Sequence, residues 1–167
     1  MVKKFIEIIM IFFILTGCSY SFHSTAYPNL KKILIQPFEN KTAEYYLGDD
    51  LLVSLTNQFR DDGRLRPVTL TPDCQLEGTI LDFSNLPFSY DQSNSIQEYQ
   101  VKILFSVTLT DLQSNQVIYE NKSLLISENY SVISNEGTSS FKTKLEAEKQ
   151  IYVDLFQNIL KNSLESW

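Results

Sequence analysis

The segment from Tyr99 to Thr110 alternates apolar and polar side chains more cleanly than any other part of the chain. In its sequence, YQVKILFSVTLT, every second residue from Tyr99 to Leu109 is apolar, and the residues between them are polar except for Leu104. Successive side chains of a β-strand point to opposite faces of the sheet, so this pattern predicts a strand with one buried face and one polar face. We therefore expect a sheet that is covered on one side only.

Two amphipathic helices are expected to provide that cover. In the first, leucines recur at helical spacing; Gly48 or Asp49 is expected to cap its start, and Gly63 to mark its end. The second is expected from Phe141 to about Ser163, with an apolar stripe along its length. Both stripes must be buried on the same sheet face, because the other face is polar.

Three further strands and two polar loops complete the pattern. The strands are expected at 33–35, 75–83 and 117–130, and the loops at roughly 84–97 and 131–140. A tight turn is expected at Asn115, since asparagine tolerates the positive φ that such a turn requires. The element order is β-α-β-β-β-α.

The last strand needs a bulge. Val117 and Tyr119 have the opposite parity to Ile126, and one extra residue restores a common face. We expect this bulge between Glu120 and Lys122, which would place an apolar side chain, and not Lys122, beside Val107.

The predicted fold class is therefore α+β. It is a two-layer sandwich in which a four-stranded mixed sheet carries two helices on one face. The first β-α-β connection is expected to be a right-handed crossover, and the other strands an antiparallel meander.

Residues 1–17 have the features of an export signal. Lys3 and Lys4 precede an apolar run of about a dozen residues, too short for the ~20 needed to span a bilayer. The run ends in Leu15-Thr16-Gly17-Cys18, which resembles the bacterial lipobox. That resemblance implies lipid attachment at Cys18, and Ser19 after it implies delivery to the outer membrane. Residues 18–30 are then a lipidated tether and residues 31–167 one α/β domain.

Composition and residue types speak against several function classes. The formal charge is −6, which disfavours nucleic-acid binding. The single histidine, His23, lies in the tether, so neither a histidine-based triad nor a histidine metal cluster can be assembled. We expect no enzyme activity, no metal and no cofactor. Cys74 is either a small buried residue, which we favour, or a reactive thiol, and a thiol nucleophile would lack a base.

The remaining charged clusters have structural explanations. The pairs Asp49-Asp50 and Asp61-Asp62 sit at the ends of the first predicted helix, where caps and solvated turns are common. Arg60, Arg64 and Arg66 follow that helix and could meet a phosphate, but a solvated face is the favoured interpretation.

Several short motifs, in order, resemble those of LptE-type lipopolysaccharide-assembly lipoproteins. These are GCSYSF, LKKILIQPFENKT, RDDGRLRPV, LEGTILDF, SYD, EYQV, VTLTDLQSNQVIYEN and the terminal LESW. The resemblance implies two helices on a four-stranded sheet, on the periplasmic face of the outer membrane. It also implies a partner, an LptD-type β-barrel that the protein plugs and helps to assemble, and possible contact with lipopolysaccharide.

One feature of the family is missing. Better-known members have basic residues in the loop before EYQ and in the loop after the last strand, whereas here SYDQSNSIQ and SVISNEGTSS contain none. Lys102, Lys142 and Lys144 remain as candidates for contact with lipopolysaccharide or the barrel. PFENKT alone also resembles curli-secretion lipoproteins and lipoprotein activators of cell-wall synthases, which stay open as the alternative function.

Overall fold

The computed structural model describes Tyr27, residues 29–131 and residues 143–165. Its elements are β1 (Lys32–Ile35), β2 (Glu39–Asn40), α2 (Leu47–Asp62), β3 (Arg66–Pro67), β4 (Cys74–Tyr90), β5 (Ile96–Asp111), β6 (Gln116–Ser131) and α3 (Lys144–Ser163). Cys18, His23, Lys142 and nearly all of the loop expected at 131–140 lie outside the described residues.

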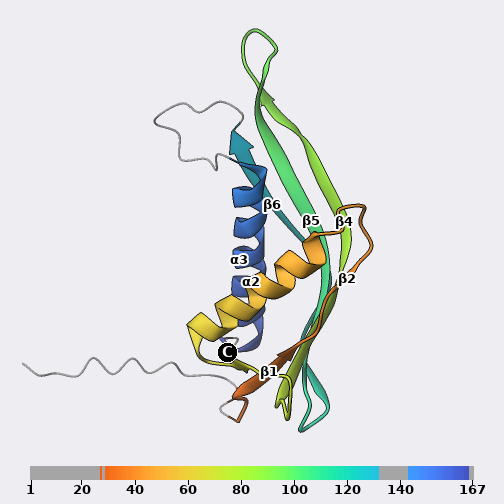
Figure 1. Cartoon of the computed structure of the whole chain (residues 1–167), viewed down its shortest axis with the longest axis vertical. Coiled ribbons are helices and arrows are strands. Elements are labelled where there is room, and N and C mark those ends of the chain that lie inside the picture. Colours follow the sequence, from red (N-terminus) through yellow and green to blue (C-terminus); the bar gives the residue numbers. More distant parts are fainter. Residues whose placement is uncertain (1–26, 28, 132–142, 166–167) are drawn as a thin grey trace, which may run out of the picture.

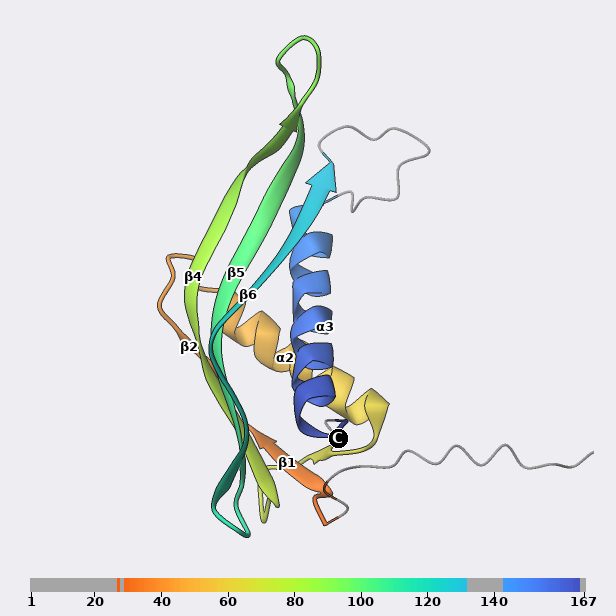
Figure 2. The ribbon, with the colours of Figure 1, turned by 180° about the vertical axis from the view of Figure 1, so that it is seen from behind.

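The strands form one mixed sheet in the order β3-β1-β4-β5-β6, with β2 paired to β4. β1 runs parallel to β4, whereas β4, β5 and β6 form an antiparallel meander. Both helices lie on the same side of this sheet (Figures 1 and 2). The predicted α+β two-layer class is confirmed. The predicted number of four strands is too low, because the two-residue strands β2 and β3 are too short to leave a pattern in the sequence.

The alternation in β5 divides the two faces of the sheet as predicted. Its helix-facing side chains, Val101, Ile103, Phe105, Val107 and Leu109, are all completely buried. Full burial of each such side chain is worth about 1.5–3 kcal/mol. β5 therefore forms the centre of the apolar core.

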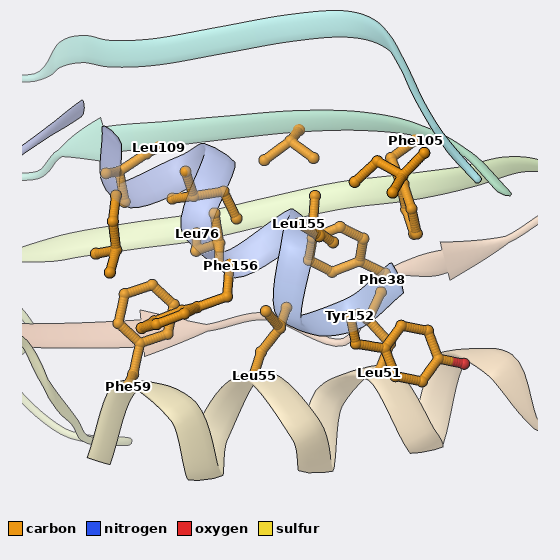
Figure 3. Packing of buried hydrophobic residues seen from close by; sticks show 14 of the residues in the cluster. Phe38, Leu51, Leu55, Phe59, Leu76, Phe105, Leu109, Tyr152, Leu155 and Phe156 are labelled. Carbon is orange, nitrogen blue, oxygen red and sulfur yellow. The ribbon is translucent and has the colours of Figure 1, made fainter. Parts of the chain in front are cut away.

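The helices complete the core from the other layer. Leu51, Leu55 and Phe59 of α2 point toward the sheet, and Leu155 and Phe156 of α3 enter between them (Figure 3). The rings of Phe59 and Phe156 meet edge to face, with centroids 4.8 Å apart. This geometry is favourable for aromatic pairs beyond the area they bury.

The ends of α2 differ in how well the sequence predicts them. The helix begins at Leu47, one residue before the expected caps, and no side chain caps it. Asp49 and Asp50 lie instead in the first turn, where their charge is favourable against the helix dipole. Gly63 ends the helix with φ 77°, as predicted, and its N–H donates to the carbonyl of Phe59.

The predicted polar loop at 84–97 is wrong. β4 continues to Tyr90 and β5 begins at Ile96, so the two strands form a long hairpin with a short turn between them. Pro87 makes this stretch look like a loop, but here β4 is an edge strand, where proline is tolerated. The hairpin projects beyond the helices (Figure 1).

The bulge predicted in the last strand is confirmed, but its predicted neighbour is wrong. Phe105 pairs with Leu124 and Val107 pairs with Asn121, so Lys122 and Ser123 together oppose one residue of β5. Val107 thus lies beside a polar residue. A second shift leaves Ile118 without a partner and brings Tyr119 opposite Leu109, on the helix-facing side. The positive φ of Asn115, 54°, confirms the predicted turn.

Gly78 marks a close approach between two parts of the core. A Cβ atom at this position would lie 2.4 Å from the ring of Phe38 and 2.4 Å from the carbonyl oxygen of Ser106. The oxygen belongs to the backbone of β5 and the ring is buried, so neither can move away easily. Only glycine fits here.

We predict that Gly78→Ala lowers the free energy of unfolding by about 1–3 kcal/mol, as expected for overpacking of a core. The measurement is urea unfolding followed by circular dichroism. Gly48→Ala is the matched control. Its added Cβ would meet nothing closer than 3.5 Å, and the change within α2 should be neutral or stabilising. Equal stability of the two variants would contradict the packing argument.

Candidate functional site

The sheet presents its other face without any helix over it (Figure 2). We call this surface the outer face. From β4 it contains Gln75, Glu77, Thr79, Asp82, Ser84 and Leu86; from β5 Gln100, Lys102, Leu104, Ser106, Thr108 and Thr110; and from β6 Val117, Glu120, Leu125, Ser127 and Asn129. It is a long, mostly polar surface, interrupted by the neighbouring pair Leu104 and Leu125 in the middle and by Leu86 and Val117 toward its ends.

Lys102 lies in the middle of the outer face. The other basic residue on this face is Lys122, in the bulge of β6, whose Nζ lies 3.5 Å from Glu120. Lys102 is half-buried, and its neighbours in the pairing register are Ser84 and Ser127. Within the described part of the chain its side chain makes no ion pair or hydrogen bond. Its ammonium group is thus available to an acidic group brought by another molecule.

The three residues of the EYQ motif each make a cross-strand contact. Ser89 donates a hydrogen bond to Glu98 (3.0 Å), and Gln100 donates one to Asn129 (2.9 Å). The ring of Tyr99 stacks on Tyr130, with centroids 5.6 Å apart. The first contact joins β4 to β5 within the hairpin and the other two join β5 to β6, which gives the motif a structural role in this chain.

Lys144 sits in a network between the two layers. Its Nζ lies 3.5 Å from Glu148 and 3.9 Å from Glu44, donates to Tyr46 Oη (3.0 Å), and is 4.8 Å from the ring centre of Phe83. Tyr46 in turn donates to Glu148 (2.8 Å). Glu148 is almost completely buried, at 2% exposure, so Lys144 neutralises a carboxylate that has little water.

The network makes Lys144 less available for contact with lipopolysaccharide or the barrel. Burial and the hydrogen bond to Glu148 raise the pKa of Tyr46, so the phenol stays protonated and keeps donating. A phosphate would have to compete with two carboxylates for the ammonium group. The i,i+4 spacing of Lys144 and Glu148 is a signal of this pairing in the sequence, but nothing there points to Tyr46.

Two of the three arginines around the end of α2 are also paired within the chain, whereas Arg66, at the start of β3, is exposed. Arg64 donates to Asp62 (2.7 Å) and to Glu165 (2.6 Å), and its side chain is only 14% exposed. Arg60 lies 3.4 Å from Asp61. Arg64 therefore joins the end of α2 to the residues after α3.

Cys74 is buried, and its thiol has low reactivity. Its side chain has no exposed area, and its Sγ lies 3.6 Å from the carbonyl oxygen of Lys32. Burial, with a smaller effect of Asp73 and Asp111, raises the pKa of the thiol from its ordinary 9.0 to about 12. A thiolate nucleophile is thus disfavoured.

Two kinds of feature are missing from the described ranges. No group of His, Cys, Asp and Glu side chains there could hold a metal ion. No helix in the same ranges is long and apolar enough to cross a membrane.

We predict that Lys144→Met destabilises the protein by about 1–3 kcal/mol, because it leaves the buried Glu148 without its cation. Thermal unfolding would measure the loss. Lys149→Met is the control on the same helix, since Lys149 is exposed and makes no ion pair with described residues, and should change stability by less than about 0.5 kcal/mol. Adding Glu148→Gln to Lys144→Met should recover part of the lost stability. Equal melting temperatures of Lys144→Met and Lys149→Met would rule out a stabilising role of the network.

We predict that Cys74 resists iodoacetamide at pH 8 in the folded protein and reacts after unfolding in guanidinium. The raised pKa alone lowers the thiolate fraction by roughly a thousandfold, and burial slows the reaction further. Mass spectrometry of the modified chain provides the measurement. Leu70→Cys, at a site where the native side chain is 78% exposed, supplies a reactive control in the same molecule. Comparable labelling of both cysteines in the folded state would revive the nucleophile hypothesis.

Solved structures resemble this fold at low sequence identity. Protein XCC0632 from Xanthomonas campestris matches with a TM-score of 0.52 and 12% identity, over 82% of this chain and 87% of that one. The hypothetical protein CT253 from Chlamydia trachomatis matches with 0.51 and 12%, over 78% and 94%. Uncharacterized lipoprotein B from Nitrosomonas europaea matches with 0.50 and 13%, over 79% and 81%. These matches support the fold.

Sequence comparison gives the family. No curated protein matches the chain. The family model of LptE, described as lipopolysaccharide-assembly, matches residues 30–162, which include every helix and strand except the last residue of α3. The chain therefore belongs to the LptE family of lipopolysaccharide-assembly proteins, as its motifs predict.

Proposed function

We propose that this protein is a non-enzymatic lipoprotein that plugs and helps to assemble an LptD-type β-barrel, through which lipopolysaccharide reaches the cell surface. In this proposal Cys18 carries the lipid, and the domain lies on the periplasmic face of the outer membrane. The match to the LptE family supports this function over the curli-secretion or synthase-activator alternative.

The observation that carries the proposal is the outer face. A sheet face of this length is normally covered by a second layer, but here most of its side chains are polar. The interior wall of a large membrane barrel is also polar and wet. Two such surfaces can meet through hydrogen bonds and water without burying an unpaired apolar patch on either side.

The chemistry of the described residues agrees with a binding role. Burial and the raised pKa make the Cys74 thiol unreactive, and Arg60 and Arg64, around the end of α2, are paired within the chain. Lys102 is left as the cation best placed to meet a lipopolysaccharide phosphate or an acidic group of the barrel. Lys142 and Lys144 stay as weaker candidates, the first outside the described residues and the second already held by Glu148.

We predict that full-length, lipidated protein retains a stoichiometric barrel of the LptD kind when purified by affinity from solubilised outer membrane. Mass spectrometry identifies and counts what stays bound. Recovery of a cell-wall synthase or a homo-oligomer in place of a barrel would favour the alternative function.

A photoreactive residue on the outer face tests whether that face contacts the barrel. We expect a benzoyl-phenylalanine at Ser106, in the middle of the outer face, to crosslink to the barrel. The same residue at Val53, exposed on α2, is the matched control. Crosslinks from Val53 without any from Ser106 would keep the barrel partner but overturn the role of the outer face.

A further inference from the structure

The two edges of the sheet are protected to different degrees. Along the upper part of β4, Pro87 and the unpaired residues Leu81 and Phe88 interrupt the edge. Bulges and prolines of this kind normally keep a free edge from pairing with other chains. On β6, in contrast, residues 124–131 pair with β5 one for one, without any shift. This stretch is a regular, unprotected edge.

The backbone groups that face outward along this edge can be identified. In an antiparallel sheet the N–H and C=O of one residue point to the same neighbouring strand, and the direction alternates along the chain. Leu112 donates to the carbonyl of Asp73 (2.9 Å), so even-numbered residues of β5 point toward β4. Odd-numbered residues of β5 then point toward β6.

The pairing of β5 with β6 shows which residues of β6 point toward β5. Ile103 is paired with Ile126, so Ile126 and its even-numbered neighbours bond to β5. Leu125, Ser127 and Asn129 must direct their N–H and C=O groups to the free edge. Within the described ranges, no hydrogen bond reaches these outward groups.

A groove runs along the same edge. It has a volume of about 510 Å³ and lies between β6 and α3, which run beside each other (Figures 1 and 2). Its lining residues are Leu125, Ile126 and Ser127 from β6, Asp154, Gln157, Asn158 and Lys161 from α3, and Glu165. A groove between an edge strand and a helix is the setting in which domains of several kinds bind an extended peptide as an added strand.

The groove has one carboxylate, Asp154, between β6 and α3, and its other charged lining residues are Lys161 and Glu165. Glu128 stands opposite Val101 on the helix-facing side of β6, close enough to Asp154 for that carboxylate to act on its pKa. Burial and this neighbouring carboxyl raise the pKa of Glu128. Gln150 donates to Asp154 (2.8 Å), but neither carboxyl has an ion pair with a described cation. Two adjacent acids in this position favour a positively charged group from outside.

We propose that residues 124–129 of β6 accept an extended segment of a partner polypeptide as an additional strand, with a Lys or Arg of that segment opposite Asp154. A second copy of this edge is a poor occupant, because its own 124–131, LLISENYS, brings Glu128 and no basic residue. The inference goes beyond the proposed function, since it specifies an extended basic segment whatever protein contributes it.

The test uses a defined peptide and the full-length, lipidated protein in detergent. The probe is a nine-residue peptide of alternating Thr and Val with one central Lys, and hydrogen–deuterium exchange is read by residue-resolved mass spectrometry. We expect the peptide to slow exchange at the amides of Leu125, Ser127 and Asn129 at least tenfold. The amides of Ile126 and Glu128 already bond to β5 and should change little.

Altered peptides and protein variants distinguish strand addition from non-specific binding of the peptide. A peptide N-methylated at every residue has no edge that can form the ladder and should give no protection. Replacing its Lys by Glu should weaken binding at least tenfold, and Asp154→Asn should abolish that difference. Ser127→Pro removes an outward N–H while sparing the bonds to β5 and should prevent protection, whereas Ser127→Ala keeps the N–H and should not.

Some results would overturn the inference. Equal protection by the normal and N-methylated peptides, or none at millimolar concentration, would show that the edge does not accept a strand. Protection of the same three amides without peptide, increasing with protein concentration, would assign the edge to a second copy. Because no barrel is present, these results do not depend on the proposed partner.

Discussion

The structure depends on the one-sided burial along β5. This strand pairs with β4 on one side and β6 on the other, and its helix-facing side chains are completely buried from Val101 to Leu109. Both helices pack on that face because it is the apolar one. Since the side-chain period of a strand is two, a slip of one residue would bring this whole row to the polar side. The layers and the outer face therefore follow from the register of β5.

The sequence predicted those features that arise from periodicity and local turn chemistry. The alternation of β5, the stripes of α2 and α3, the positive φ of Gly63 and Asn115, and the bulge in β6 each leave a signal within a few residues. The fold class follows from them. The comparison with the LptE family then agreed with the motifs, which are also local in the sequence.

The features that sequence analysis missed depend on pairing between distant segments. Pro87 and the polar residues around it look like a loop, and only the partner strand shows that 84–90 continues as an edge. Val107 meets Asn121 because a second shift at Ile118 changes the register, and neither residue alone predicts this. Lys144 looked like a free cation for a ligand, but Tyr46 and Glu44, about a hundred residues earlier in the chain, hold it together with Glu148.

The length of the β4–β5 hairpin has a consequence for how the molecule can sit at a bilayer. β4 spans 17 residues, which at a rise of about 3.3 Å per residue gives a length of roughly 50 Å. The start of β4 pairs with β1, next to the N-terminal segment, and its far end forms the hairpin tip. The hydrocarbon core of a membrane is only about 30 Å thick. If the hairpin stands along the membrane normal with its N-terminal end at one interface, the tip extends well past the other, and only a strong tilt keeps both ends within one membrane thickness.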